Sequence, residues 1–161
     1  IVIPQRDSDV RQTTEIYLEP TSTMVFLDLL APGRVAHGER YAFRRLETCL
    51  RIHEGGDLMA KERCVLEPIK DVWPLRVPGW DLCYYGALWI VGAKAAQSIK
   101  RLSEWHADPE ACHVGASLVC SRLGVIRFVA KSSLVLRKLT QQLRSHVQVD
   151  FPLLSKDFRK L

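Results

Sequence analysis

The sequence has no long run of apolar residues. Its longest apolar stretch, Ala87 to Ala93, is interrupted by Gly92 and falls far short of the ~20 residues that a membrane-spanning helix needs. The first residues, IVIPQRD, lack the basic region and the cleavage site of a secretory signal peptide. These absences favour a cytoplasmic protein without a membrane segment. The chain also starts without Met, and we expect it to be a fragment whose upstream half is missing.

Closely spaced cysteines are absent too. The chain has an odd number of cysteines, none in the Cys-x-x-Cys spacing of a structural zinc site, which indicates reduced and mostly buried thiols: Cys49, Cys64, Cys83, Cys112 and Cys120. Two alternatives stay open, because distant residues can meet in space. One is a soft metal site at Cys112-His113 with Cys120, and the other is a nucleophilic Cys/His pair.

Catalytic sequence motifs are missing as well. There is no glycine-rich loop of the Walker or dinucleotide type, no nucleophile elbow and no His-Glu-x-x-His. His106 and His146 have apolar neighbours at helical spacing, and we interpret both as hydrogen-bonded core residues rather than ligands. The sequence therefore predicts a protein that is not an enzyme and binds no cofactor tightly. A thiol-dependent hydrolase is the less favoured alternative.

What the chain does contain is enough apolar sequence for a folded core. It has 161 residues, of which 47% are hydrophobic, so we expect residues 1–161 to form a single domain. The net charge of +5 is unevenly spread: residues 122–161 hold nine of the 23 Lys and Arg residues but two of the 18 Asp and Glu residues. A basic C-terminal segment indicates an acidic protein partner or nucleic acid, although a solvated helix face would look the same.

Most of the chain has the pattern of β-strands. Residues 12–18 are rich in Thr, Ile and Tyr, residues 24–30 are mostly apolar, and Pro20-Thr21-Ser22 between them indicates a turn. A long hairpin is expected after Gly38. Further strands are predicted at residues 81–91, 116–120 and 125–130.

The apolar faces of the long hairpin predict its register. Apolar residues alternate along both strands, from Leu46 to Ile52 and from Leu58 to Leu66. A three-residue loop, Gly55-Gly56-Asp57, brings the two faces together. It pairs Ile52 with Ala60, Thr48 with Cys64 and Leu46 with Leu66. In this register Cys49 points away from Cys64, which argues against a disulfide between them.

Two segments have the spacing of amphipathic helices. The first has a stripe formed by Ala95, Ile99, Leu102 and His106, and Asp108-Pro109 ends it. Ser132 or Ser133 can cap the second, whose apolar face is formed by Val135, Leu136, Leu139, Leu143 and His146. The sequence thus predicts a mainly β fold with antiparallel sheets and about two helices, near residues 94–106 and 133–146.

The segment from Gly33 to Glu39 stands out from the rest. Its two glycines, Gly33 and Gly38, bracket a tight excursion between strands, and each is followed by a charged residue, Arg34 or Glu39. The simplest interpretation is a turn with an Arg34–Glu39 ion pair. The apolar alternation changes phase shortly afterwards, at Arg44-Arg45, where a β-bulge is expected.

Several short elements of the chain follow one another in a characteristic order. A strand ends in a small-Gly-Arg segment at residues 28–34, and Gly-Glu with two aromatic residues follows at residues 38–43. Residues 3–12 contain Arg6-Asp7-Ser8 and Gln12, and residues 56–68 contain Glu62-Arg63. These elements, with residues 115–128 before a basic terminal helix, resemble the UreD/UreH family of urease accessory proteins. Residues 69–112 match loosely, and Gln5 or Arg6 stands where that family usually has an aromatic residue.

The resemblance implies a β-helix-like, two-layer fold with a few helices. It also implies a non-catalytic scaffold in the complex that delivers nickel to the urease apoprotein. The implied partners are a UreF-like accessory protein, a UreG-like GTPase and the urease apoprotein, with no nucleic acid and no membrane. A basic β-rich domain that binds nucleic acid or another protein is the alternative.

The same resemblance implies candidate site residues. Nickel would be a cargo in transit rather than a bound cofactor, and Asp7 and Glu39 match the positions of acidic residues along its route. An isolated carboxylate suits such a role, because it holds Ni²⁺ weakly. Gly33, Arg34, Gly38 and Glu39 form the candidate partner-facing or structural motif.

Overall fold

The computed structural model describes residues 1–68, 70 and 77–155 and is mainly β with two α-helices, as predicted. The basic residues after position 155 lie outside the described residues. The strands are β1 (Asp9–Leu18), β2 (Met24–Leu30), β3 (Arg45–Glu54), β4 (Asp57–Leu66), β5 (Tyr84–Val91), β6 (Cys112–Cys120) and β7 (Leu123–Ala130). The helices are α1 (Ala95–Ser103) and α2 (Ser133–Gln148), with short 3-10 helices η1 (Val35–His37) and η3 (Pro152–Ser155).

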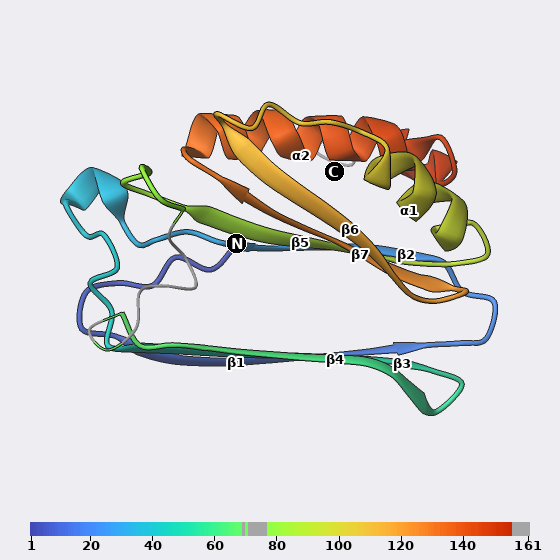
Figure 1. The fold of residues 1–161 in the computed structure, drawn as a ribbon. Helices are drawn as coiled ribbons and strands as arrows, with labels where there is room; N and C mark the ends of the chain where they lie inside the picture. Colours follow the sequence, from blue (N-terminus) through green and yellow to red (C-terminus); the bar gives the residue numbers. More distant parts are fainter. Residues whose placement is uncertain (69, 71–76, 156–161) are drawn as a thin grey trace. The chain divides into compact units, whose positions relative to one another are not determined.

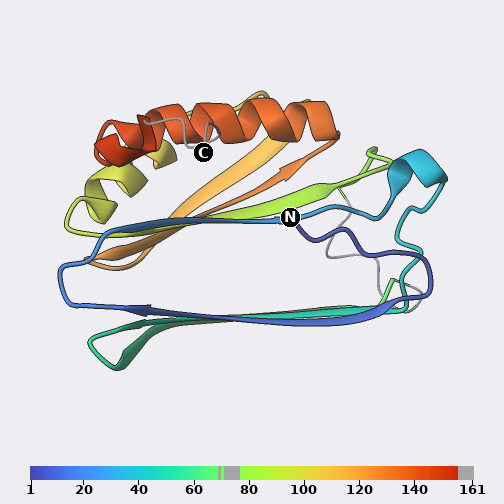
Figure 2. The ribbon, with the colours of Figure 1, turned by 180° about the vertical axis from the view of Figure 1, so that it is seen from behind.

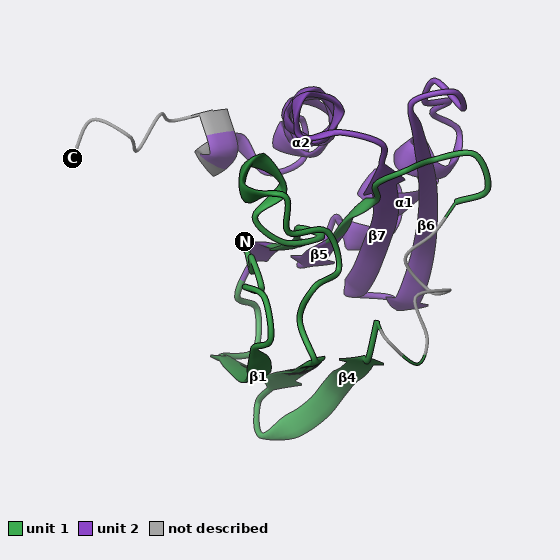
Figure 3. Ribbon diagram, turned by 90° about the vertical axis from the view of Figure 1, so that its left-hand side faces the viewer, with its two compact units in different colours: residues 1–22, 28–86 green, residues 23–27, 87–161 purple. Residues whose placement is uncertain are grey.

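The strands form two sheets, in the orders β1-β3-β4 and β2-β5-β7-β6 (Figure 1). The β3–β4 and β6–β7 pairs are antiparallel, as expected, but β1 pairs with β3 in parallel over its full length. Strand β2 lies between β1 and β3 in the chain yet belongs to the other sheet. A parallel pair needs such a crossover, since a tight turn cannot join two parallel strands. The chain divides into two compact units, unit 1 (residues 1–22 and 28–86) and unit 2 (residues 23–27 and 87–161) (Figure 3).

The β3–β4 hairpin of unit 1 has the predicted pairs but a different loop. Leu46 faces Leu66, Thr48 faces Cys64 and Ile52 faces Ala60. The predicted three-residue loop is wrong, because Glu54 already faces Asp57 and only Gly55-Gly56 turn the chain. Both glycines have positive φ, as a two-residue hairpin turn requires. The register shifts at Ile52/His53, where a bulge at Met59 supplies the extra residue.

The same register settles the disposition of two thiols. Cys49 faces Arg63 and Cys64 faces Thr48, so the two cysteines occupy opposite faces of adjacent strands. All five cysteines are free, which confirms the expected absence of a Cys49–Cys64 disulfide.

An irregular segment before β3 lets residues of different parity reach one core. Strand β3 begins at Arg45, and the backbone amides of Arg44 and Arg45 both donate to Ser8 O, at 2.9 and 3.2 Å. The alternation changes phase in this irregular segment, so the predicted β-bulge at Arg44-Arg45 is wrong, because β3 begins only at Arg45. As a result the side chains of Tyr41, Phe43, Leu46 and Leu66 pack into one buried cluster of unit 1.

Both helices of unit 2 cover the same face of the sheet to which β5 and β7 belong (Figures 1 and 2). Ser132 caps α2 as expected, since its hydroxyl accepts a hydrogen bond from the amide of Val135 at 3.2 Å. The buried stripe of α2 is Leu136, Leu139, Leu143 and Val147. Within the described ranges, neither helix is long and apolar enough to cross a membrane.

One of the two expectations for histidines in unit 2 needs correction. Helix α1 buries Ala95, Ile99 and Leu102 as predicted, but it ends at Ser103, and His106 beyond it is exposed. The prediction that His106 continues the buried stripe is therefore wrong, because the helical spacing stops before it. His146 on α2 is half-buried and packs against the ring of Trp105, with 5.1 Å between ring centroids.

Candidate functional site

The Gly33–Glu39 loop of unit 1 is held by its backbone. Gly33 has φ +130°, and a Cβ atom there would lie 2.5 Å from Glu39 O and 3.3 Å from Pro4 O. Gly38 ends η1 in the left-handed conformation, with φ +70°. The amide of Tyr41 donates to Pro32 O at 2.7 Å and closes the loop. Only glycine fits at Gly33, because both the backbone angle and the contact exclude a side chain.

The Glu39 carboxylate is the electrostatic centre of this loop. Arg34 binds it in a bidentate pair, Nε to Oε2 at 2.9 Å and Nη2 to Oε1 at 2.6 Å, and the Arg6 amide donates to Oε2 at 3.0 Å. Glu39 is buried, with 6% of its surface exposed, whereas the Arg34 side chain is 41% exposed. The hydrogen bond from Arg34 outweighs desolvation and lowers the pKa of Glu39 from 4.5 to about 2. The predicted Arg34–Glu39 pair is confirmed.

Asp7 lies in the segment that touches this loop, but its side chain is exposed. The backbone of Asp7 adopts a left-handed conformation, φ +58°, and the Asp7 amide donates to Ala42 O at 2.9 Å. The preceding residue, Arg6, supplies the amide that reaches Glu39. In residues 1–68, 70 and 77–155 no group of three or more His, Cys, Asp or Glu side chains is placed to hold a metal ion. Both Glu39 oxygens already accept hydrogen bonds, so a metal ion there would compete with Arg34.

The structure does not bring together the cysteines of the possible soft metal site. Cys112 and Cys120 lie at the two ends of β6, a separation of roughly 26 Å for an extended strand. Cys112 is buried, and burial together with the nearby charge of Asp108 raises the pKa of its thiol. A raised pKa keeps a thiol protonated, whereas a nucleophilic cysteine needs the thiolate.

The comparison with known protein families decides the identity of this fold. The family model described as UreD urease accessory protein matches residues 2–156. The chain belongs to the UreD family.

Individual UreD relatives agree with this assignment. The urease accessory protein UreD of Opitutus terrae is 31% identical over 167 residues, which cover 99% of this chain and 59% of that protein. The UreD of Halalkalibacterium halodurans is 32% identical over 90 residues, 55% of this chain and 32% of the relative. The urease accessory protein UreH of Helicobacter hepaticus is 34% identical over 67 residues, 42% of this chain and 27% of the relative. The chain thus spans about three fifths of the length of the Opitutus terrae UreD.

A second buried carboxylate of this UreD-family chain, Glu47 on β3, was not anticipated. Three guanidinium groups from three strands surround it: Arg63 at 3.0 Å, Arg45 at 2.6 Å and Arg11 at 3.4 Å. The hydrogen bond from Arg63 outweighs desolvation and lowers the pKa of Glu47. Glu47 follows Leu46 in the sequence and therefore points to the opposite face of the sheet. The alternation of apolar residues along β3 is enough to predict this face for Glu47. The parallel pairing of β1 with β3, which brings Arg11 beside Glu47, cannot be predicted from the sequence near either strand.

The low pKa of Glu39 predicts how the stability of this UreD-family chain depends on pH. A depressed carboxylate pKa contributes stability that is present above about pH 4.5 and is lost as the pH falls through about 2. We expect Glu39→Gln to flatten the fall in stability over this acid range, because glutamine has no charge to lose. Arg34→Met should flatten it too, since it removes the main cause of the shift. Urea denaturation at a series of pH values measures this. An unchanged slope in both variants would show that the Arg34–Glu39 pair does not contribute to stability in this pH range.

Proposed function

We propose that this chain is part of a urease accessory protein that acts as a non-catalytic scaffold in the delivery of nickel to the urease apoprotein. The observation that carries the proposal is the match of residues 2–156 to the UreD urease accessory protein family. The relatives that match in sequence are themselves called urease accessory proteins. The partners that this role requires are the urease apoprotein, a UreF-like accessory protein and a UreG-like GTPase.

We further propose Asp7 and Glu39 as transient carboxylate ligands for nickel. Carboxylate oxygens are weak ligands for Ni²⁺ compared with thiolates and imidazoles, and weak binding suits a cargo that has to leave. The low pKa of Glu39 supports its part, because the carboxylate is ionised at neutral pH without a metal. The exposed side chain of Asp7, one residue from the amide that binds Glu39, supports a first contact from solvent.

In this mechanism Arg34 and the metal compete for one carboxylate. Arg34 donates to both oxygens of Glu39, so nickel can bind there only when the guanidinium moves away. The Arg34 side chain is 41% exposed, so solvent is open to the guanidinium when it leaves Glu39. Arg34 thereby keeps Glu39 satisfied when no metal is present, which avoids the cost of an unpaired buried charge.

Urease activation in cells tests both levels of this proposal. The full-length protein is expressed with the urease apoprotein and the other accessory proteins in a strain without its own UreD, and nickel incorporation and ureolysis are measured. We expect no activation without the protein, and reduced activation with Glu39→Ala or Asp7→Ala. Glu47→Ala is the matched control, because Glu47 is also a buried carboxylate bound by arginine in unit 1 but is not placed on the route.

The outcomes separate the scaffold from the route. Activation that is independent of the full-length protein would refute the accessory role. Full activation and nickel content in both Glu39→Ala and Asp7→Ala would remove these residues from the route and leave the scaffold role standing. Equal loss in Glu47→Ala and Glu39→Ala would point to folding rather than to nickel.

A further inference from the structure

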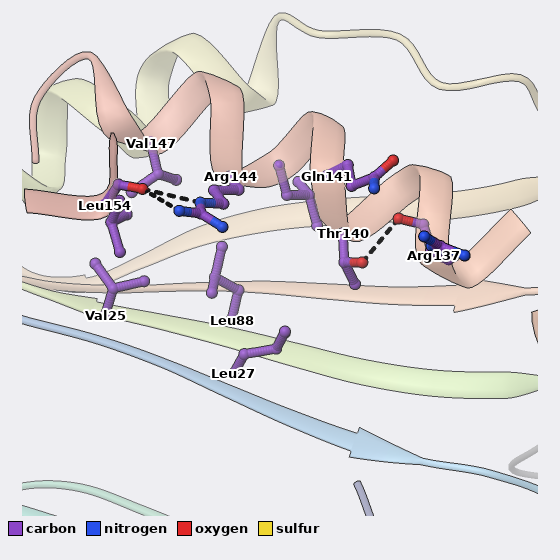
Figure 4. Close-up of a pocket in the computed structure, with 10 residues that line it drawn as sticks. Val25, Leu27, Leu88, Arg137, Thr140, Gln141, Arg144, Val147 and Leu154 are labelled. Atoms are coloured by element: carbon purple, nitrogen blue, oxygen red, sulfur yellow. Dashed lines mark hydrogen bonds between the residues drawn. The ribbon is translucent and has the colours of Figure 1, made fainter. Parts of the chain in front are cut away.

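Unit 2 carries an open apolar groove between α2 and the strands beneath it. The groove has a volume of about 360 Å³. Apolar side chains of β2, β5 and α2 line it, and those of the strands, Val25, Leu27 and Leu88, form its floor (Figure 4). Leu27, in the middle of β2, is 40% exposed and so presents apolar surface to the groove.

A polar stripe on α2 forms the rim of this groove. The stripe consists of Arg137, Thr140, Gln141 and Arg144, whose spacing of three, four and seven residues places them on one face of the helix. The Thr140 hydroxyl donates to Arg137 O at 2.9 Å, and Arg144 Nε donates to Leu154 O at 2.9 Å (Figure 4). Arg144 thus fixes η3 at one end of the groove.

The other end of the rim is marked by Arg137. Its side chain is exposed and makes no ion pair or hydrogen bond with any residue in the described part of the chain. Helix α2 carries Arg137, Lys138 and Arg144 and has no Asp or Glu, so its net charge is positive. An apolar floor beside uncompensated positive charge is complementary to a segment that carries bulky apolar side chains next to carboxylates.

We propose that this groove is the docking site for an acidic amphipathic segment of a partner protein. The segment inserts an apolar side chain over Leu27 and Leu88 and places a carboxylate against Arg137. The inference rests on the proposed function, because it places the partner among the urease apoprotein and the other accessory proteins. It assigns the contact to this groove of unit 2, and not to the charged surface of α2 in general.

Two adjacent cations on α2 allow a matched test. Arg137 lines the groove and Lys138 does not, and both are exposed, so Arg137→Glu and Lys138→Glu make the same charge change one residue apart. Leu27→Asp tests the floor at a position exposed enough to accept a polar residue. The full-length protein and each variant are co-expressed with the urease apoprotein and the other accessory proteins. Each component that co-purifies is quantified, and the affinity for it is measured at two salt concentrations.

We expect Arg137→Glu and Leu27→Asp each to weaken the binding of one component about tenfold or more, and Lys138→Glu to keep the wild-type affinity within about twofold. The loss in Arg137→Glu should shrink at high salt, since the contact is a screened charge pair. Thermal melts of the purified variants establish that all three are folded. If one groove variant fails to fold, the other groove variant decides the test, with Lys138→Glu as its control.

Four results would overturn the proposal. Wild-type binding in both groove variants would place the partner elsewhere and leave the proposed function intact. Equal losses in Arg137→Glu and Lys138→Glu would show that general charge, not the groove, is responsible. A dimer of the protein alone that dissociates in Arg137→Glu would make a second copy the occupant. A wild-type protein that binds none of the urease components would remove both this inference and the proposed function.

Discussion

Replacing Gly33 by alanine should lower the stability of folding by about 3 kcal/mol or more. Two costs combine at this position. The φ of +130° is a conformation that L-residues rarely adopt, and a Cβ atom would lie 2.5 Å from Glu39 O. The clash is with the backbone atom Glu39 O, and Pro4 O makes a tight contact at 3.3 Å, so no side chain can rotate away to relieve it. Urea denaturation of the variant measures the loss.

Gly38→Ala is the control within the same loop. Gly38 also has a positive φ, +70°, but nothing lies within 4 Å of a Cβ atom there. Alanine at Gly38 should therefore cost about 1–2 kcal/mol, the strain of a left-handed residue alone. The difference between the variants isolates the contact with Glu39 O. Similar losses at both positions would mean that the loop around Gly33 yields more easily than its backbone contacts indicate.

The consequence for the proposed nickel route is also testable in these variants. Glu39 is positioned by Arg34, by the Arg6 amide and by the approach of its own carbonyl to Gly33. Gly33→Ala forces this carbonyl away and displaces the carboxylate with it. Urease activation should fall with Gly33→Ala beyond any fall in protein level, and Gly38→Ala should reduce it less.

The hairpin shows what apolar alternation can and cannot predict. The pairs Leu46–Leu66 and Ile52–Ala60 follow from matching buried faces, because a slip of one residue would expose every apolar side chain. The loop length does not follow from the same pattern. A two-residue loop with a bulge at Met59 and a three-residue loop without one give the same pairs beyond Ile52. The two solutions differ only in local backbone conformation, which the alternation does not encode.

In the candidate site, too, local contacts can be predicted from the sequence and long-range contacts cannot. The Arg34–Glu39 pair was predictable because the two glycines force a short turn that brings residues five positions apart together. The Arg6 amide on Glu39 depends on a contact between segments 33 residues apart, for which a single sequence has no signal. The spacing of Arg137 to Arg144 is enough to predict that they share one face of α2. The groove beside them cannot be predicted, because the strands that complete it come from distant parts of the chain.

The second large effect is expected at the Asp150 carboxylate of unit 2. Its side chain is 3% exposed and joins the end of α2 to α1. Ser98 Oγ donates to Oδ2 at 2.6 Å, and Arg101 Nη1 lies 3.0 Å from the same oxygen. Arg101 Nη1 also donates to His146 O at 3.0 Å. Arg101→Met should cost about 3 kcal/mol, because it leaves a buried charge with one hydrogen bond where the wild type has a salt bridge.

Arg101→Met should also reverse the direction in which stability changes with pH, which a loss of packing alone would not do. Burial by itself raises the pKa of Asp150, but the hydrogen bonds from Ser98 and Arg101 and the charge of Arg101 outweigh it, so the pKa lies below its ordinary value of 3.8. A depressed pKa makes the wild type lose stability from this group as the pH falls below that value. Without Arg101, burial dominates and raises the pKa, so the variant should lose stability as the pH rises instead.

The double variant Arg101→Met/Asp150→Asn separates charge from lost contacts. Asparagine keeps an oxygen that can accept the hydrogen bond from Ser98. It carries no charge, so this buried position no longer needs a counter-ion. We expect the double variant to regain most of the stability lost in Arg101→Met and to lose the reversed pH dependence. If the double variant is no more stable than Arg101→Met at neutral pH, the loss comes from the packing of Arg101 and its bond to His146 O. The charge of Asp150 would then be held by solvent and Ser98, and the ion pair would not be what joins the two helices.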